Sequence, residues 1–266
     1  MQIRNALVTG AAARLGRAMA LALGEQGFDV VVHYATDETG AQEVVALLQD
    51  MGRKAVALQA DLLEEEATHA LLPDAAEALG GPITVLVNNA SIFEYDNVES
   101  ATRDSWDRNF GTNLRAPFIL TQALAAQAPD PSTDHMGEPK AEAMIVNMID
   151  QCVRKLTPNF MTYTLAKAAL WTLTQTSARA LTSHVRVNGI GPGPTLQATF
   201  QTDAHFAAQR AGTVMKRGSN TEDITGALLY FLNAPAVTGQ LLCVDGGQHL
   251  GWKTPDIIGL EIREKS

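Results

Sequence analysis

Residues 144–167 read MIVNMIDQCVRKLTPNFMTYTLAK, which is a strand pattern followed by a helix pattern. The first five residues are mostly apolar and favour a short buried strand. Beyond Asp150 the chain enters a segment predicted as a helix, in which Tyr163 and Lys167 are four residues apart. Positions i and i+4 share one face of a helix, so the phenol and the ammonium are expected to point at one spot.

This tyrosine–lysine pair suits proton transfer. A nearby positive charge favours the phenolate, and we therefore expect Lys167 to lower the pKa of Tyr163 from about 10 toward the working pH. A phenol with such a pKa exchanges a proton with a substrate while hydride moves elsewhere. The spacing alone also arises by chance, so the interpretation depends on the segments that precede it.

Strand and helix patterns alternate through the rest of the chain, and a polar insertion at 129–140 is predicted as a surface loop. This alternation predicts a parallel sheet covered on both faces. No repeat or linker divides the chain, so we predict an α/β fold with a single Rossmann-type doubly wound domain over residues 1–266 and a seven-stranded parallel sheet flanked by helices. The predicted strands are 3–9, 29–33, 54–59, 83–87, 144–148, 185–190 and 240–244, and the predicted helices are 15–23, 40–51, 62–79, 103–127, the segment around Tyr163, 203–211 and 221–232.

Composition excludes several classes of function. The chain has 266 residues, of which 46% are apolar, and this is enough for a full core. Its net charge of −9 argues against nucleic acid as a partner, because nucleic-acid binding needs a basic stripe. No apolar run approaches the roughly 18 residues that span a membrane, and the N-terminus shows no secretion signal.

Cysteine and histidine usage points to a cytoplasmic protein without a metal. Cys152 and Cys243 are the only two cysteines, and two cysteines do not make a disulfide framework. The six histidines are scattered without paired ligand spacing, so no metal site is expected. We therefore expect a reducing, cytoplasmic location.

The turn from Thr9 to Gly16, TGAAARLG, lies between the first predicted strand and the first predicted helix. A dinucleotide fingerprint belongs at this position. Gly10 permits a tight turn, Gly16 permits close helix–strand packing, and the helix start at Leu15 offers N–H groups to a pyrophosphate. Arg14 occupies the place of the middle glycine, where its guanidinium suits phosphate oxygens. An ordinary βα turn with glycines is the alternative.

The end of the second strand bears on the choice of nucleotide. An acid at that place would bind a ribose 2′-hydroxyl and favour NAD, but the chain has Tyr34 there, so NADP(H) is favoured over NAD(H). Asp37, slightly further along the chain, is an acid and would favour NAD(H) instead. Asp61 is a candidate to accept from the adenine amino group. The residues expected to contact the cofactor are Gly10, Arg14, Leu15, Gly16, His33, Tyr34, Thr36, Asp61, Leu62, Asn89, Ala90, Tyr163, Lys167, Pro192 and Gly193.

Together these motifs resemble the short-chain dehydrogenase/reductase family over residues 3–247. The resemblance implies that Lys167 also binds the nicotinamide ribose, that Asn113 helps to hold a water for proton relay, and that the protein is a homotetramer. The motifs that carry it are the TGxxxxxG turn, Asp61, Asn88-Asn89-Ala90, Asn113, Tyr163 with Lys167, Asn188, Gly191-Pro192-Gly193 and Asp245-Gly246-Gly247.

Three departures narrow the resemblance. Asp150 stands at the place of the usual catalytic serine, Arg14 at the middle glycine, and Phe93 just beyond the Asn-Asn-Ala turn. This combination is similar to the pteridine reductase and dihydromonapterin or dihydrofolate reductase branch of the family. That branch implies NADPH as cofactor and a pterin that stacks between an aromatic ring and the nicotinamide. Ala13 is a further departure, because relatives often carry Lys or Arg there.

The chemistry of Asp150 agrees with this branch. A serine donates to a ketone oxygen, whereas a carboxyl group can accept from a pterin N–H or, when protonated, donate to a ring nitrogen. Burial would raise the pKa of Asp150 and make it a proton source. Phe93 offers a flat apolar face to the ring. The expected substrate contacts are Arg14, Ser91, Phe93, Asp150 and Tyr163, and the expected catalytic residues are Asp150, Tyr163, Lys167 and Asn113.

The sequence thus predicts an NADPH-dependent reductase that transfers hydride to a C=N bond of a pterin-like substrate. A carbonyl reductase of the same family and a non-catalytic dinucleotide sensor are the alternatives. Residues 194–216 are predicted as a substrate lid. The C-terminal extension, 248–266, carries Trp252, Ile257, Ile258 and Leu260, which we expect to pack on a neighbouring subunit.

Overall fold

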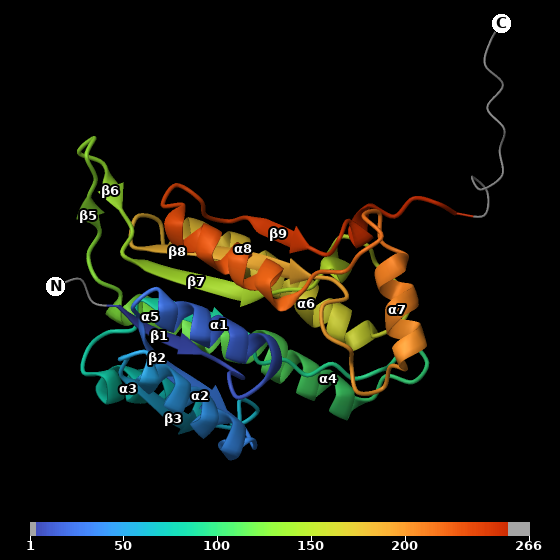
Figure 1. The fold of residues 1–266 in the computed structure, drawn as a ribbon, viewed down its shortest axis with the longest axis horizontal. Coiled ribbons are helices and arrows are strands. Elements are labelled where there is room, and N and C mark those ends of the chain that lie inside the picture. The colour runs from blue at the N-terminus through green and yellow to red at the C-terminus, as the bar shows by residue number, and fades with distance from the viewer. Residues whose placement is uncertain (1–3, 255–266) are drawn as a thin grey trace, which may run out of the picture.

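Seven parallel strands form one sheet in the computed structural model, which describes residues 4–254 (Figure 1). The strand order is β3-β2-β1-β4-β7-β8-β9, so the order in which the chain adds strands to the sheet reverses between β1 and β4. Open sheets of this kind bind ligands at the carboxyl ends of the strands where the order reverses. The strands are β1 (Asn5–Val8), β2 (Asp29–Tyr34), β3 (Ala55–Gln59), β4 (Val85–Asn88), β7 (Ala143–Met148), β8 (Val185–Pro192) and β9 (Leu241–Val244).

Helices cover both faces of this sheet, as the alternating pattern predicts. Helices α1, α2 and α8 pack on one face, and α3, α5 and α6 pack on the other. The predicted doubly wound Rossmann-type domain with a seven-stranded parallel sheet is therefore confirmed. The helices are α1 (Arg14–Glu25), α2 (Glu38–Asp50), α3 (Glu65–Leu79), α4 (Arg103–Phe110), α5 (Ala116–Gln127), α6 (Met161–Ala180), α7 (Asp203–Ala211) and α8 (Thr221–Asn233).

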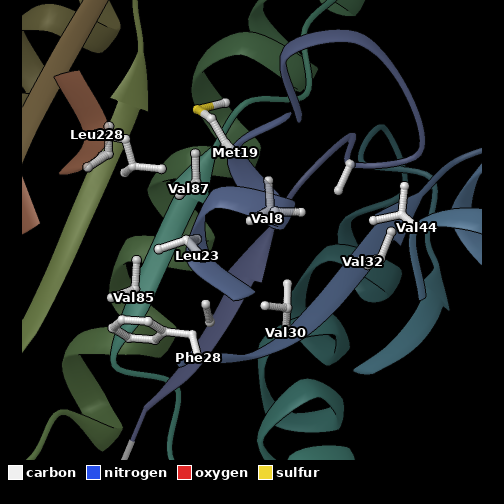
Figure 2. Close-up of a cluster of buried hydrophobic side chains, with 14 of the residues drawn as sticks. Val8, Met19, Leu23, Phe28, Val30, Val32, Val44, Val85, Val87 and Leu228 are labelled. Carbon is white, nitrogen blue, oxygen red and sulfur yellow. The ribbon is translucent and has the colours of Figure 1, made fainter. Parts of the chain in front are cut away.

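The core follows from the two-residue period of the strands. In β1, Ala6 and Val8 point to one face and Leu7 to the other, and all three are fully buried. Figure 2 shows the first face, where Val8 lies among Val30, Val32 and Val87 of the neighbouring strands and Met19 and Leu23 of α1. Both faces of the central strands are buried, so the sequences of these strands are continuous apolar runs. The packing on both faces holds the ends of these strands in fixed positions.

The helix predicted at 103–127 is helical throughout, but it is not α-helical throughout. A π-helical segment, Gly111–Arg115, joins α4 to α5. Pro117 lies in the first turn of α5 and has no N–H to donate to the preceding turn, which interrupts the α-helical hydrogen-bond ladder there. The helix predicted at 62–79 begins later, at Glu65, because Asp61 first turns the chain by accepting from the Leu63 N–H at 2.9 Å.

The insertion at 129–140 contains a small hairpin rather than only a loop. Strands β5 (Ser132–Thr133) and β6 (Pro139–Lys140) pair antiparallel, and the Asp134 carboxylate accepts from two backbone N–H groups in the turn. Figure 1 shows this hairpin at the end of the molecule opposite α7. It therefore lies away from the carboxyl ends of the strands.

Within residues 4–254 no helix combines the length and the apolar character needed to cross a membrane. Trp252 of the predicted C-terminal extension is exposed. Ile257, Ile258 and Leu260, the other apolar residues of that prediction, lie outside the described residues.

Candidate active site

A cavity of about 760 Å³ opens at the carboxyl ends of the central strands. Both halves of the predicted site border it: the turn after β1 and the residues that follow β7. Among the predicted residues, Tyr34, Thr36 and Asn113 do not line it. Those that do are Gly10, Arg14, Leu15, Gly16, His33, Asp61, Leu62, Asn89, Ala90, Ser91, Phe93, Asp150, Tyr163, Lys167, Pro192 and Gly193.

The turn after β1 leaves no space for a side chain at Gly16. A Cβ atom built there would lie 2.1 Å from the carbonyl oxygen of Gly10, well inside contact distance. Gly10 itself has a φ of +62°, in the left-handed region. The start of α1 can therefore approach β1 closely, and its first N–H groups border the cavity.

Arg14 occupies a backbone conformation that normally favours glycine. Its φ is +54°, which costs a residue with a side chain about 1–2 kcal/mol. This explains why a glycine is the usual residue at this place. The guanidinium Nη2 donates to the carbonyl oxygens of Leu196 at 3.2 Å and Gln197 at 3.0 Å. Arg14 thus connects the turn after β1 with the predicted lid.

His33 holds the same turn from beneath. The Gly10 N–H donates to His33 Nδ1 at 3.0 Å, so that nitrogen is unprotonated and Nε2 carries the proton toward the carbonyl oxygen of Ala60, also at 3.0 Å. Burial lowers the pKa of His33 to about 4. The ring is therefore neutral near pH 7 and supplies no positive charge to a phosphate.

The end of β4 is tied to the turn as well. Asn89 Nδ2 donates to the carbonyl oxygens of Thr9 at 2.9 Å and Gly10 at 3.0 Å. The Thr9 hydroxyl accepts from the N–H groups of Asn89 and Ala90. Thr9 was not among the predicted site residues, although it directly precedes Gly10 in the sequence.

The structure assigns local contacts to two acids near β2 and β3. The Asp37 carboxylate accepts from the Gly40 N–H at 3.0 Å and caps the start of α2. Asp61 borders the cavity while its carboxylate accepts from the Leu63 N–H. Ala35, rather than Tyr34 or Thr36, lines the wall beyond β2. The capping contact accounts for an acid at position 37, so no contact with a nucleotide ribose is needed to explain Asp37.

At the other end of the cavity Asp150 and Tyr163 form a hydrogen-bonded pair. The Tyr163 hydroxyl donates to Asp150 Oδ2 at 2.9 Å, and Asp150 Oδ1 accepts from the Cys152 N–H at 2.7 Å. Burial raises the pKa of Asp150, as predicted. The carboxyl group borders the cavity from the position usually held by a hydroxyl.

The prediction that Lys167 lowers the pKa of Tyr163 is wrong for this structure. Burial, followed by the charge of Asp150, raises the pKa of Tyr163 well above its ordinary value. The Lys167 ammonium donates instead to the carbonyl oxygen of Met148 at 2.8 Å, and burial lowers the pKa of Lys167 to about 8. The carboxyl group, not the ammonium, is hydrogen-bonded to the phenol.

Asn113 lies behind the cavity wall. Its side chain is fully buried on the π-helical segment, donates to the carbonyl oxygen of Ile92 at 2.9 Å and accepts from the Ser91 hydroxyl at 2.7 Å. Asn113 therefore positions the loop that follows β4, and Ser91 is the residue of the two that borders the cavity.

Phe93 and Phe200 line the cavity, and the ring of Phe160 packs against both. Phe93 is 42% exposed and stacks on Phe160, with ring centroids 4.4 Å apart and planes inclined by 16°. Its ring centroid is 4.7 Å from that of Tyr163 and 5.6 Å from that of Phe200. Phe160 was not predicted as part of the site, although it precedes Tyr163 by three residues.

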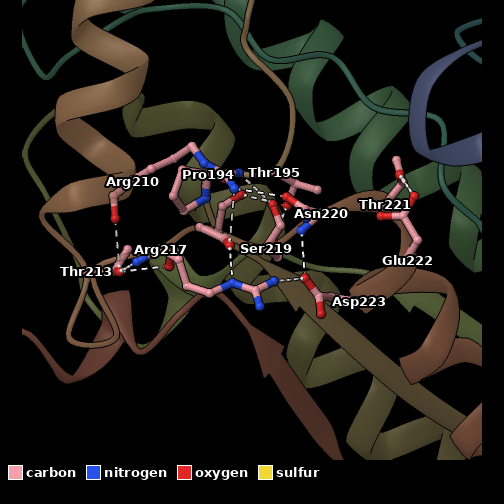
Figure 3. Close-up of polar contacts among 12 residues, drawn as sticks. Pro194, Thr195, Arg210, Thr213, Arg217, Ser219, Asn220, Thr221, Glu222 and Asp223 are labelled. Atoms are coloured by element: carbon pink, nitrogen blue, oxygen red, sulfur yellow. Dashed lines mark hydrogen bonds and ion pairs between the residues drawn. The ribbon is translucent and has the colours of Figure 1, made fainter.

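The predicted lid borders the cavity through Thr195, Leu196, Ala198, Thr199 and Phe200. Figure 3 shows how Arg210 of α7 joins the start of this segment to residues just beyond its end. Its Nη1 donates to the carbonyl oxygens of Pro194 at 2.8 Å and Ser219 at 2.7 Å. Arg210 escaped the sequence analysis because its partners are backbone atoms that only the folded chain brings together.

The chain matches known oxidoreductases along most of its length. A family model described as enoyl-(acyl carrier protein) reductase matches residues 10–249. Pteridine reductase 1 of Leishmania tarentolae is 30% identical in an alignment 287 positions long, which covers 92% of this chain and 96% of that protein. 3beta-Hydroxysteroid dehydrogenase 1 of Eggerthella lenta is 31% identical over 254 residues, which cover 93% of this chain and 94% of that protein.

A solved structure with a similar fold is that of FolM alternative dihydrofolate reductase 1 from Brucella suis in complex with NADP. The TM-score is 0.88 at 37% sequence identity, and the match covers 96% of this chain and 98% of that one. The likeness therefore extends over the sheet and both helical layers.

Proposed function

The chain belongs to the short-chain dehydrogenase/reductase family, and from this premise we propose that it is an NADPH-dependent reductase of a pterin-like substrate of the dihydropteridine or dihydrofolate type. The observation that carries the proposal is the position of Asp150. Its carboxyl group borders the cavity and is hydrogen-bonded to the Tyr163 hydroxyl at 2.9 Å. A carboxyl group there serves ring nitrogens better than a ketone oxygen.

The residues at the turn after β1 fit a dinucleotide. The first residues of α1 line the cavity, where N–H groups at the start of a helix can serve phosphate oxygens, and the lack of a side chain at Gly16 lets this helix approach the turn closely. NADP(H), when bound, supplies the hydride that reduces the carbon of the C=N bond. Every further step concerns the proton that the nitrogen must receive.

In the proposed mechanism Asp150 gives that proton. Its raised pKa keeps a proton available on the carboxyl group at higher pH than an ordinary aspartic acid allows. Tyr163, whose raised pKa keeps its phenol protonated, donates a hydrogen bond to the same carboxyl group and orients it, and solvent returns the proton to Asp150 after transfer. Lys167, held by the carbonyl oxygen of Met148, fixes the position of α6 beside β7.

Phe93 and Arg14 support a flat, nitrogen-rich substrate. The Phe93 ring is partly exposed at the mouth of the cavity and offers an aromatic face close to Tyr163. The Arg14 guanidinium reaches across to the lid carbonyls and stands where it can also contact a substrate or a phosphate. Ser91 completes the proposed substrate contacts.

We propose that NADP(H) is preferred over NAD(H). The end of β2 carries no acid that would bind a ribose 2′-hydroxyl, because Asp37 is engaged as the cap of α2. The B. suis relative is described in complex with NADP. Titration of the protein with NADPH and with NADH, followed by nucleotide fluorescence, tests the preference. Tighter binding of NADH would contradict it.

A carbonyl reductase is the second candidate, since a hydroxysteroid dehydrogenase is among the relatives. The two functions are separated by following NADPH oxidation with dihydrobiopterin and dihydrofolate beside a panel of ketones. Turnover of the pterins supports the proposal. Turnover of ketones alone would favour the second candidate, and nucleotide binding without any turnover would favour a sensor.

We further propose a cytoplasmic homotetramer. Cys152 and Cys243 are both free thiols, which suits a reducing compartment. Trp106 of α4 and Phe118 of α5 are large apolar side chains that are each more than a third exposed, which suits a contact with another subunit. Light scattering in solution tests the tetramer, and a monomeric mass would contradict it.

A further inference from the structure

Asp96 is a buried acid that the proposed mechanism does not use. It lies in the loop after β4, is 3% exposed, and takes part in no ion pair within residues 4–254. A buried carboxylate without a cation is costly unless hydrogen bonds compensate it. Three donors do so here: the Thr162 N–H at 3.1 Å, the Thr162 hydroxyl at 2.6 Å and the Ser105 hydroxyl at 3.1 Å.

The helix that carries Tyr163 has no cap of its own. Phe160 occupies the N-cap position of α6, makes no side-chain capping bond, and has a φ of +55°, in the left-handed region. Asp96, 66 residues earlier in the chain than Thr162, accepts from the first turn of α6 instead. Its negative charge also lies at the positive end of the helix.

Asp96 is the end of a longer contact between two segments. Residues 93–96, which we call the anchor segment, run beside residues 159–162. Phe93 stacks on Phe160, the Tyr95 hydroxyl donates to Asn159 Oδ1 at 3.3 Å, and the Met161 N–H donates to the Asp96 carbonyl oxygen at 3.4 Å. The contact therefore extends from the proposed substrate face to the residue before Tyr163.

We propose that Asp96 is a positioning residue that holds the Tyr163 phenol and the Phe93 ring in fixed relation. The Phe93 ring belongs to the anchor segment, and the Tyr163 phenol directly follows residues 159–162, which pack on that segment. The carboxylate of Asp96 joins the two segments where α6 begins. The inference rests on the proposed function, because it assigns the aromatic face and the phenol to one substrate. The nucleotide turn at 9–16 takes no part in it.

Asp96→Ala tests the inference with the full-length protein. At saturating NADPH we expect kcat for dihydrobiopterin to fall about tenfold to a hundredfold, since small misplacements of reacting groups have effects of this size. The Kd for NADPH, measured by nucleotide fluorescence, is expected to stay within about twofold of the wild type. Asp96→Asn, whose amide oxygen can still accept from the Thr162 N–H, is expected to recover part of kcat.

Asp29→Ala is the matched control. Asp29 is also a carboxylate that accepts from a backbone N–H, that of Lys54 at 2.8 Å, but it lies at the start of β2, away from the cavity. A lower Tm with unchanged kcat is expected. If Asp96→Ala does not fold, Thr162→Val replaces it, because this change removes the hydroxyl that donates to Asp96 at 2.6 Å.

Hydrogen exchange of the backbone separates this inference from the proposed function. In Asp96→Ala, amides 162–165 of α6 are expected to exchange at least about tenfold faster than in the wild type, whether or not a pterin is reduced. A wild type that reduces no pterin would contradict the proposed function alone. Unchanged exchange at 162–165, or an unchanged kcat in a wild type that does reduce dihydrobiopterin, would overturn the role of Asp96.

Discussion

At residue 14 the backbone adopts a conformation that glycine adopts freely and arginine does not. Arg14→Gly and Arg14→Ala both remove the guanidinium contacts with Leu196 and Gln197, but only the alanine keeps a Cβ in the left-handed region. The free energy of unfolding of the glycine variant is therefore expected to be about 1 kcal/mol higher than that of the alanine variant. Urea denaturation measures the difference. An alanine variant as stable as the glycine variant would show that the position carries no strain.

The protonation of Asp150 gives a second prediction at the scale of the residue. Burial raises the pKa of Asp150 above its ordinary value of 3.8, and the proton-donating form is lost as the pH rises through the raised pKa. With NADPH saturating, kcat/KM for dihydrobiopterin is expected to fall with rising pH. In Asp150→Asn the residual activity should lack this fall, because the amide does not titrate. An identical pH profile in both proteins would contradict the assignment.

Single residues also show where sequence reasoning succeeds and where it stops. Asp150 and Phe93 were predicted because they replace or follow recognisable motif positions, and both border the cavity. The direction in which the pKa of Tyr163 shifts was not predicted correctly, because it depends on the orientations of Asp150 and Lys167 in the folded chain. Asp96 has no motif around it, and its partner is 66 residues away.

At the scale of the elements, Arg210 joins the start of the predicted lid to residues just beyond its end. Arg210→Met leaves the carbonyl oxygens of Pro194 and Ser219 without this donor, and each lost hydrogen bond to a charged group costs about 1.5–3 kcal/mol. Limited proteolysis is expected to cut residues 194–220 faster in this variant, and KM for dihydrobiopterin is expected to rise.

Arg217→Met provides the comparison for this element. Arg217 pairs with Asp223 at the surface, where ion pairs contribute little stability. We expect its rate of proteolysis and its KM to remain near the wild type. Equal effects of the two substitutions would show that Arg210 has no special part in holding the lid.

The elements themselves were largely predictable. Alternating apolar strands and helices indicate the seven-stranded parallel sheet because its central strands are buried on both faces. The π-helical segment at Gly111–Arg115 was missed, since the effect of Pro117 on the preceding turn has no periodic pattern. The hairpin in the insertion was missed because its strands are only two residues long.

For the whole molecule, the pH dependence of stability is expected to reflect His33. Burial lowers the pKa of His33 from 6.5 to about 4, so the stability that the neutral ring provides is complete above pH 6.5 and is lost as the pH falls toward 4. The loss corresponds to about 3 kcal/mol. Urea unfolding of the wild type and of His33→Gln at pH 7 and pH 4.5 measures it. If the two proteins lose the same stability, His33 is not the cause.

The central claim is that the carboxyl group of Asp150 protonates a ring nitrogen of a pterin. Asp150→Ser restores the hydroxyl usual in the family and tests this most directly, with NADPH oxidation followed on dihydrobiopterin and on a ketone panel. We expect kcat/KM for dihydrobiopterin to fall about a hundredfold, the range that a lost general acid gives, with the Kd for NADPH unchanged. Equal pterin reduction by the serine variant and the wild type would contradict the claim.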